Sequence, residues 1–442
     1  MIFALVLYGA AVLAIGVRAS RKAGESREEF LVAGRSFSPL MAWAGLSSTV
    51  IGGSTTLVLA SLVAQKGLPG LWLDFAGVLG LLALGLFLAR KVRESRALTI
   101  SEVIGRAYGP AVRKIAALLV VLASIVWFAL LTQATEAVLT AMTPWNPTRV
   151  LVGTAVLFVA YTTLGGQRAV VGTDVVQLTL MVVALLGIAV PLALVSLAKT
   201  GWPVTHLVFP TSAVYRWTDV AAVLVLVGLP HAVGSDVWSK LLSARDERAA
   251  RTAALGAAAS KLVFGLGTAT IALAGVALGF RASPALYPQT LVALAGETLA
   301  PVLLVALVAT MQTSSDSVLL SASAATAHDL LPGLPPWATR VLVVGYGVLG
   351  LVVALALRDV VATFRLGYTI FAAGLILPTL VAFLPGVTLS RTFAGLAMAG
   401  GGGVALVAAL LALSGRPLGP DPVLLGTGAN LLLMLPGLRT RR

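Results

Sequence analysis

Charged residues are scarce in this sequence, and cysteine is absent. Asp, Glu, Lys and Arg together make up 11% of the 442 residues, whereas soluble domains carry roughly 25%. Without cysteine the chain has no disulfides, no thiolate metal site and no cysteine nucleophile, and three histidines are too few to favour a zinc site. Because 58% of the residues are hydrophobic, the chain cannot cover itself with polar surface, and its expected solvent is lipid.

The hydrophobic residues are collected in runs of about 16 to 28 residues, each long enough to cross a hydrocarbon core of roughly 30 Å as a helix. No segment between the runs is long or charged enough for a separate soluble domain, so we predict one all-α polytopic membrane domain over 1–442. We expect about thirteen transmembrane helices, near 2–17, 40–64, 70–89, 115–141, 150–164, 170–198, 217–238, 253–280, 299–323, 337–357, 361–384, 392–413 and 421–437.

The basic residues follow membrane topology better than a nucleic-acid site, although the net charge is +14. The first span has no positive segment before it and RASRK after it, which favours an anchor over a signal peptide. With the N-terminus outside, the inside loops hold 22 Lys and Arg and the outside loops hold eight, as the positive-inside rule requires. We therefore expect a multi-pass protein of the cell (inner) membrane with its C-terminus in the cytoplasm.

Two spans are broken at mid-membrane. The second contains Gly52-Gly53 between hydroxyl residues, and the seventh contains Gly228, Pro230 and Gly234. Such breaks free backbone groups that lipid cannot satisfy, so they are expected to face a cavity or other helices. Paired broken helices in corresponding halves indicate the binding site of a transporter, although glycines also serve tight helix packing.

The two broken spans lie five helices apart and therefore run in opposite directions, as an inverted repeat of five plus five helices requires. We place the repeats at approximately 37–198 and 215–385, with flanking helices at 2–17, 392–413 and 421–437.

Hydroxyl and carboxyl groups crowd the ninth span, in the segment TMQTSSDSVLL. Hard monovalent cations are held by oxygen ligands, and an intramembrane carboxylate such as Asp316 is costly unless it is paired or binds an ion. A serine-rich helix interface would explain the hydroxyls but not the aspartate. In the sixth span, Asp174 could complete a cation site, shuttle a proton or pair with an arginine. Other acids in or near the spans are expected to face substrate (Asp74, Glu136) or to be interfacial (Asp236, Glu297).

Five segments together resemble the sodium/solute symporter family, which includes sodium-coupled sugar, proline, pantothenate and sialic acid carriers. They are GRSFSPLMAWAGLSST, LTISEVIGRAYG, GGQRAVVGTDVVQ, GLPHAVGSDVWSKLLSARDERAAR and MQTSSDSVLL followed by AHDL. The resemblance covers nearly the whole chain and implies a five-plus-five inverted repeat of the leucine-transporter type with flanking helices.

The resemblance also implies a sodium site between the second and ninth spans. Its ligands would be the backbone carbonyls of Val50, Gly53 and Thr310 and the hydroxyls of Thr313 and Ser314. A second cation, or a proton, would bind at Asp174, Thr313, Asp316 and Ser317. The chain departs from its relatives at two places. Asp316 stands where one relative has serine, which would place two carboxylates close together. Ser239-Lys240 replaces an arginine that relatives often have a little later.

These features predict sodium-driven symport of a small organic solute (a sugar, an amino acid or a carboxylate) by alternating access. Substrate is expected near Gly52, Ser54, Thr56, Asp74, Gln133, Glu136 and His231, although Gln133 and Glu136 could equally serve helix packing. The alternatives are proton coupling through Asp174 and Asp316 and, with less support, a transporter-like membrane sensor. No enzyme is predicted, since no metal-ligand set or histidine base is apparent. No cofactor beyond the coupling sodium, no nucleic acid and no protein partner are required.

Overall fold

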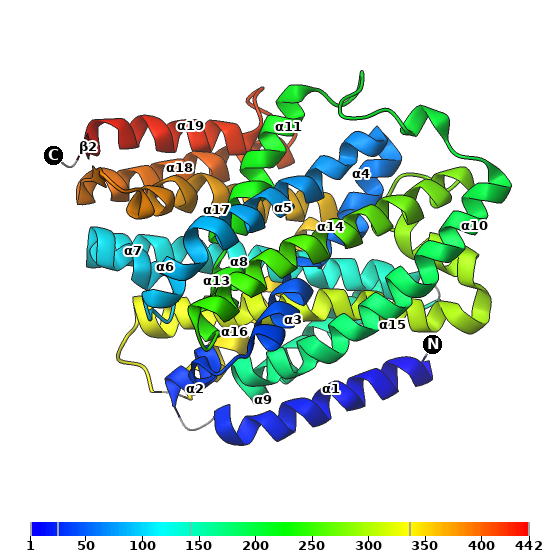
Figure 1. The fold of residues 1–442 in the computed structure, drawn as a ribbon, viewed down its shortest axis with the longest axis horizontal. Helices are drawn as coiled ribbons and strands as arrows, with labels where there is room; N and C mark the ends of the chain where they lie inside the picture. The colour runs from blue at the N-terminus through cyan, green and yellow to red at the C-terminus, as the bar shows by residue number, and fades with distance from the viewer. Residues whose placement is uncertain (1, 24–25, 142, 336, 441–442) are drawn as a thin grey trace.

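The chain is described by a computed structural model for residues 2–23, 26–141, 143–335 and 337–440. This part of the chain is almost entirely helical (Figure 1). The helices are α1 (Ile2–Ala23), α2 (Arg27–Val32), α3 (Pro39–Val50), α4 (Leu59–Lys66), α5 (Trp72–Ala83), α6 (Ala89–Glu94), α7 (Ile100–Tyr108), α8 (Pro110–Thr140), α9 (Pro147–Met181), α10 (Val190–Thr200), α11 (Trp217–Val223), α12 (Leu229–Val233), α13 (Ser235–Ser243), α14 (Glu247–Ala277), α15 (Leu286–Ala324), α16 (Ala338–Leu357), α17 (Val360–Phe383), α18 (Arg391–Leu413) and α19 (Pro422–Met434).

Shorter turns of 3₁₀ or π geometry connect or interrupt these helices. They are η1 (Ala33–Arg35), η2 (Ser54–Val58), η3 (Leu68–Leu71), η4 (Leu84–Leu88), η5 (Val182–Ala189), η6 (Val204–His206), η7 (Leu224–Gly228), η8 (Ala325–Leu330) and η9 (Leu435–Gly437). An antiparallel pairing joins β1 (Val387–Leu389) to β2 (Leu438–Thr440).

The predicted spans are present as apolar helices. In the described residues, nine helices are long and apolar enough to cross a membrane. The bent pair Pro39–Val50 and Ser54–Lys66 makes a tenth span, and two shorter apolar helices lie near the two ends of the chain. One of the nine, Pro147–Thr200, contains two predicted spans. With that run counted twice, the structure accounts for the thirteen helices expected.

The run Pro147–Thr200 turns back on itself at Gly166, whose φ of 56° and ψ of −160° are not helical. The Tyr161 hydroxyl lies 2.6 Å from the Thr173 hydroxyl. Twelve residues of straight helix would separate these positions by roughly 18 Å, so the hydrogen bond requires a turn between them. The turn lies between the predicted spans 150–164 and 170–198, as their separation requires.

Both predicted helix breaks are found. The axis changes by 52° between the helical segments on either side of Ile51–Gly53, and Gly234, with ψ of 140°, separates α12 from α13. Glycine is needed beside the second break because a Cβ on Gly228 would lie 3.0 Å from the Ala76 carbonyl oxygen of α5. The breaks therefore belong to tightly packed helices in the protein interior.

The broken helices are surrounded by the other spans. Helix α3 packs against α9, α13 and α14, and α15 packs against α8 and α9. In Figure 1, α1 lies along one edge of the molecule, whereas α18 and α19 lie side by side along the opposite edge, packed on α17. The predicted flanking helices thus lie outside the helices that hold the breaks.

Candidate functional site: the helix break and a central pocket

The break after α3 leaves three successive carbonyl groups without helical partners, and side chains from other helices bind all three. Thr313 of α15 donates its hydroxyl to the Ser48 carbonyl at 2.9 Å, and Ser314 donates to the Thr49 carbonyl at 2.8 Å. Lys261 of α14 donates to the Val50 carbonyl at 3.2 Å. Side chains of α14 and α15 therefore satisfy the backbone carbonyls at the end of α3.

The predicted sodium ligands are partly gathered at this point. Thr313 and Ser314 share the Thr310 carbonyl as a second acceptor, at 3.1 and 3.3 Å. The Val50 carbonyl instead faces α14, and the Gly53 carbonyl accepts the backbone N–H of Val58 at 3.1 Å. The carbonyls that meet the α15 hydroxyls are those of Ser48 and Thr49, which sequence reasoning missed because backbone groups carry no residue signature.

Glycine at the break allows α15 to approach. A Cβ on Gly52 would lie 2.5 Å from the Ser314 hydroxyl oxygen, too close for a real contact, and 3.2 Å from its Cβ, which is tighter than most. Ser317 extends the same hydroxyl row, since its Oγ lies 3.1 Å from the Thr49 Oγ1. The hydroxyl-rich face of α15 is thus the face that packs on the broken helix.

Asp174 is paired with a lysine. Its Oδ2 accepts a hydrogen bond from the Lys240 ammonium of α13 at 2.9 Å, and both side chains are fully buried. The pairing expected for Asp174 as one alternative therefore exists, with lysine in the place of arginine. A Cβ on Gly45 of α3 would lie 3.3 Å from the Asp174 Oδ2, so a small residue beside the pair makes room for it.

Asp316 has different partners from Asp174. Its Oδ1 lies 2.7 Å from the Thr162 hydroxyl, which also lies 2.8 Å from the Phe158 carbonyl. Oδ2 of Asp316 and Oδ1 of Asp174 are both buried without a partner in the described residues. A further polar chain reaches this region, in which Gln177 donates to the Tyr8 hydroxyl and Tyr8 donates to Gln312 at 2.6 Å; sequence reasoning assigned no role to Tyr8 or Gln312.

Asp74 is also paired with a lysine. Its Oδ1 lies 2.9 Å from the Lys261 ammonium, and both side chains are buried. Asp74 does not line the central pocket, so the structure places it beside the break and not against the space where a solute would bind.

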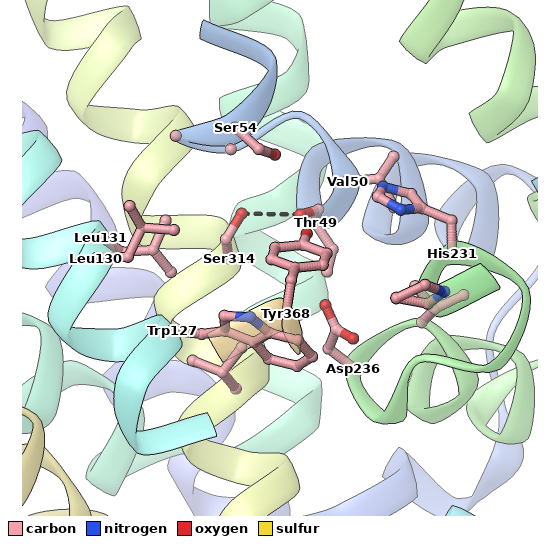
Figure 2. A pocket seen from close by; sticks show the side chains of 15 residues that line it. Thr49, Val50, Ser54, Trp127, Leu130, Leu131, His231, Asp236, Ser314 and Tyr368 are labelled. Atoms are coloured by element: carbon pink, nitrogen blue, oxygen red, sulfur yellow. Dashed lines mark hydrogen bonds between the residues drawn. The ribbon is translucent and has the colours of Figure 1, made fainter. Parts of the chain in front are cut away.

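A pocket lies in the middle of the bundle, between the two helix breaks (Figure 2). Its volume is about 50 Å³, enough for a few water molecules only, so a solute requires it to widen. It is lined by Thr49, Val50, Gly52, Gly53, Ser54, Trp127, Leu130, Leu131, Pro230, His231, Asp236, Val237, Ser314, Val318 and Tyr368.

Aromatic rings and one carboxylate give this pocket its character. The rings of Trp127 and Tyr368 have centroids 5.1 Å apart, and His231 stacks on Tyr368 at 6.4 Å. Asp236 points into the same space (Figure 2) and accepts backbone N–H groups at the start of α13. Asp236 was expected at an interface, and the structure corrects this: the break at Gly234 turns it into the pocket.

Trp127 and Tyr368 were missed because aromatic residues in apolar spans resemble ordinary core residues.

The predicted substrate residues divide into groups. Gly52, Ser54 and His231 line the central pocket. Thr56 is buried and donates back to the Gly52 carbonyl at 2.9 Å. Gln133 and Glu136 line a different, more open cavity that also contains Arg358, and Gln133 donates to the Ala354 carbonyl at 3.0 Å. A helix-packing contact, one of the two readings left open for Gln133, is therefore present.

A second cluster of charges ties α7 and α8 to η8, away from the central pocket. Arg113 pairs with Asp329 at 2.6 Å, and Glu102 accepts hydrogen bonds from His328 and Arg106. Burial alone would raise the pKa of Glu102, but hydrogen bonds from His328, the Leu98 N–H and Arg106 lower it to about 2. The cluster holds the start of α8 against the end of the α15–η8 run.

Two broken helices facing one pocket, within a bundle of apolar spans, define the leucine-transporter fold, an architecture found among secondary transporters. The structure of a Na⁺-coupled sialic acid symporter in its substrate-bound outward-open state matches 98% of this chain and 96% of that chain with a TM-score of 0.80 and 17% identity. The transporter MhsT in complex with L-phenylalanine matches with a TM-score of 0.58 and 15% identity, over 90% of this chain and 98% of that one.

The chain belongs to the sodium:solute symporter family, which matches residues 30–366, and it is a multi-pass membrane protein. A high-affinity choline transporter of Torpedo marmorata is 28% identical over 367 residues, which cover 74% of this chain and 61% of that protein. The human sodium/iodide cotransporter is 26% identical over 180 residues, 41% of this chain and 28% of that protein. The chain thus matches less than two thirds of the length of these relatives.

Proposed function

We propose that this protein carries out sodium-coupled symport and that sodium binds between the end of α3 and α15. The observation that carries this proposal is the pair of hydrogen bonds from Thr313 and Ser314 to the Ser48 and Thr49 carbonyls. A hydroxyl group can rotate its proton away and offer its oxygen, so the same four oxygens can surround a monovalent cation. Carbonyls freed by a helix break are suited to this role in transporters.

The ion and the solute would share structural elements, which is the physical basis of coupling. Thr49 and Ser314 belong to the hydroxyl row and also line the central pocket. A sodium ion that holds α15 against the break would stabilise the form of the pocket that binds solute. Both ligands must favour the same state for transport to be coupled.

We propose a small organic cation as the solute. Asp236 is a carboxylate inside the span Trp217–Ser243 that forms no ion pair among the described residues, because the two buried lysines bind Asp74 and Asp174 instead. A carboxylate inside a membrane span is costly without a cationic partner, and the faces of Trp127 and Tyr368 attract the same kind of group. The high-affinity choline transporters among the relatives are consistent with this. Of the solutes expected from the sequence, an amino acid offers an ammonium group, whereas a sugar offers no positive charge and a simple carboxylate would be repelled by Asp236.

Uptake into proteoliposomes tests both parts. With choline as the probe, we expect uptake driven by an inward sodium gradient, and Thr313→Ala should remove the response to sodium. Asp236→Asn should lower choline uptake about 10- to 100-fold, the equivalent of roughly 1.5–3 kcal/mol for a hydrogen bond or contact to a charged group. Glu297→Gln, a matched change at an exposed acid, should leave uptake unchanged. Uptake indifferent to sodium would refute the coupling, and equal uptake by the Asp236→Asn protein would refute the solute class.

Proton coupling through Asp316 is the second candidate, and one observation favours it. The Thr162 hydroxyl has one proton but lies within bonding distance of both the Phe158 carbonyl and Asp316. A proton on Asp316, donated to Thr162, would give each of the two contacts its own hydrogen. Asp316→Asn would then abolish the pH dependence of uptake, whereas a purely sodium-coupled carrier would keep it. Asp174 is less suited to this role because its charge is matched by Lys240.

We also propose that the N-terminus lies outside and that the protein resides in the cell membrane. The absence of cysteine makes this directly testable by single-cysteine labelling. Thr200→Cys should react with a membrane-impermeant maleimide in intact cells, and Glu28→Cys should react only after permeabilisation. The reverse pattern would overturn the orientation.

A further inference from the structure

A fully buried ammonium group lies against the helix break on the side opposite α15. Lys261 is in the middle of α14 and is 0% exposed. Its Nζ lies 3.2 Å from the Val50 carbonyl, 2.5 Å from the Thr55 hydroxyl and 2.9 Å from the Asp74 carboxylate. Three N–H donors thus meet three oxygens, which come from two different parts of the chain.

The surrounding helices are shaped to hold this group. A Cβ on Gly77 of α5 would collide with the Lys261 Cε, and a Cβ on Gly265 of α14 would lie 2.6 Å from the Asp74 Oδ2. Side chains are therefore missing at the two positions where they would displace the lysine or its aspartate. The space around the ammonium is a built site and not a chance contact.

The oxygens around Lys261 are those expected of an ion site. A carbonyl freed by a helix break, a hydroxyl and a carboxylate are hard ligands, and such groups bind alkali cations in transporters. Oδ2 of Asp74 is buried without a partner in the described residues and offers a fourth oxygen. Hydrophobic replacements of buried ion pairs are often as stable as the pair itself, so stability alone does not explain a lysine here.

We propose that the Lys261 ammonium is a tethered cation filling an ion site formed by Val50, Thr55 and Asp74, and that its removal opens this site to a sodium ion. The protein would then need no free ion on the α14 side of the break. The positive charge of Lys261 would stay with the chain during the whole transport cycle. Only the sodium ion on the α15 side of the break would be bound and released.

The test is the number of sodium ions bound by purified protein, measured with ²²Na⁺ at equilibrium with N-methyl-D-glucamine as the replacing cation. Lys261→Met should bind one more sodium ion per protein than the parent chain. The double variant Lys261→Met, Asp74→Asn should lose the additional ion, because the carboxylate is then absent. Lys199→Met, the same change at an exposed lysine, should bind as the parent does.

An unchanged sodium count in Lys261→Met would overturn the proposal, as would an additional ion that persists in the double variant. If Lys261→Met does not fold, Lys261→Gln provides the same neutral change with a polar side chain, and the same two outcomes decide. The result is separate from the proposed function. A parent chain that binds no sodium would refute sodium coupling, whereas the gain of one ion on removing Lys261 would still stand.

Discussion

Removing Lys240 should destabilise the protein by an amount that depends on Asp174. The two groups are fully buried and 2.9 Å apart, and the other oxygen of Asp174 already lacks a partner. Truncating one member of a buried ion pair costs about 3–5 kcal/mol, because the remaining charge is left in a medium that does not solvate it. With an unfolding entropy of roughly 2.1 cal/mol/K per residue, this corresponds to a fall in Tm of about 3–5 °C for a chain of this length.

The assay is thermal unfolding of the purified protein in detergent, for Lys240→Met, Asp174→Asn and the double variant. Each single variant should lose about 3–5 °C, and the double variant should recover most of this because no lone charge remains. Lys199→Met, on the exposed surface, should change Tm by less than about 1 °C. Strictly additive losses would refute the reasoning, since they would mean that the two side chains do not stabilise each other.

Three further outcomes are expected. Gly52→Ala should weaken sodium binding at least about fivefold, because a Cβ there overpacks Ser314 and costs roughly 1–3 kcal/mol. Gly9→Ala, which has open space around it, should bind sodium as the parent does, and ²²Na⁺ binding isotherms compare the two variants. Glu102→Gln should lower Tm at pH 7, and the loss should shrink progressively as the pH falls from 4.5 towards 2. The lowered pKa of Glu102 gives stability that is complete above pH 4.5 and lost as pH falls towards 2. Gln133→Leu should keep choline uptake within about twofold while lowering stability by roughly 1 kcal/mol; a larger loss of uptake would restore Gln133 to the substrate site.

The spans, the breaks and the turn at Gly166 could be predicted because each depends on local chemistry. Apolar length determines a membrane helix, and the glycines and prolines near Gly52, Gly166 and Pro230 mark points at which a helix can be interrupted. The first part of α15 was not predicted. The expected span 299–323 begins after Gly296, whose positive φ separates it from an earlier helical part that starts at Leu286.

The candidate site was harder to predict, because its groups are brought together by packing. Lys261 and Asp74 are 187 positions apart in the sequence, and nothing in either segment names the other as its partner. The role of Asp236 depends on the backbone direction at Gly234, which a composition or motif does not give. By contrast, the crowding of hydroxyls near Thr313 in an apolar span had no explanation as lipid-facing surface, so sequence alone directed attention to it.

The pairing of both buried lysines with aspartates has an electrical consequence. Since Asp74 and Asp174 are each matched by an ammonium group, these four side chains add no net charge to the membrane interior. On the proposed function and with Asp316 protonated, Asp236 leaves the empty carrier with one negative charge there, an organic cation cancels it, and sodium makes the loaded form positive. Each elementary charge that crosses is worth roughly 2.3 kcal/mol per 100 mV. A membrane potential, negative inside, would therefore speed the inward step of the loaded carrier and also the return of the empty one.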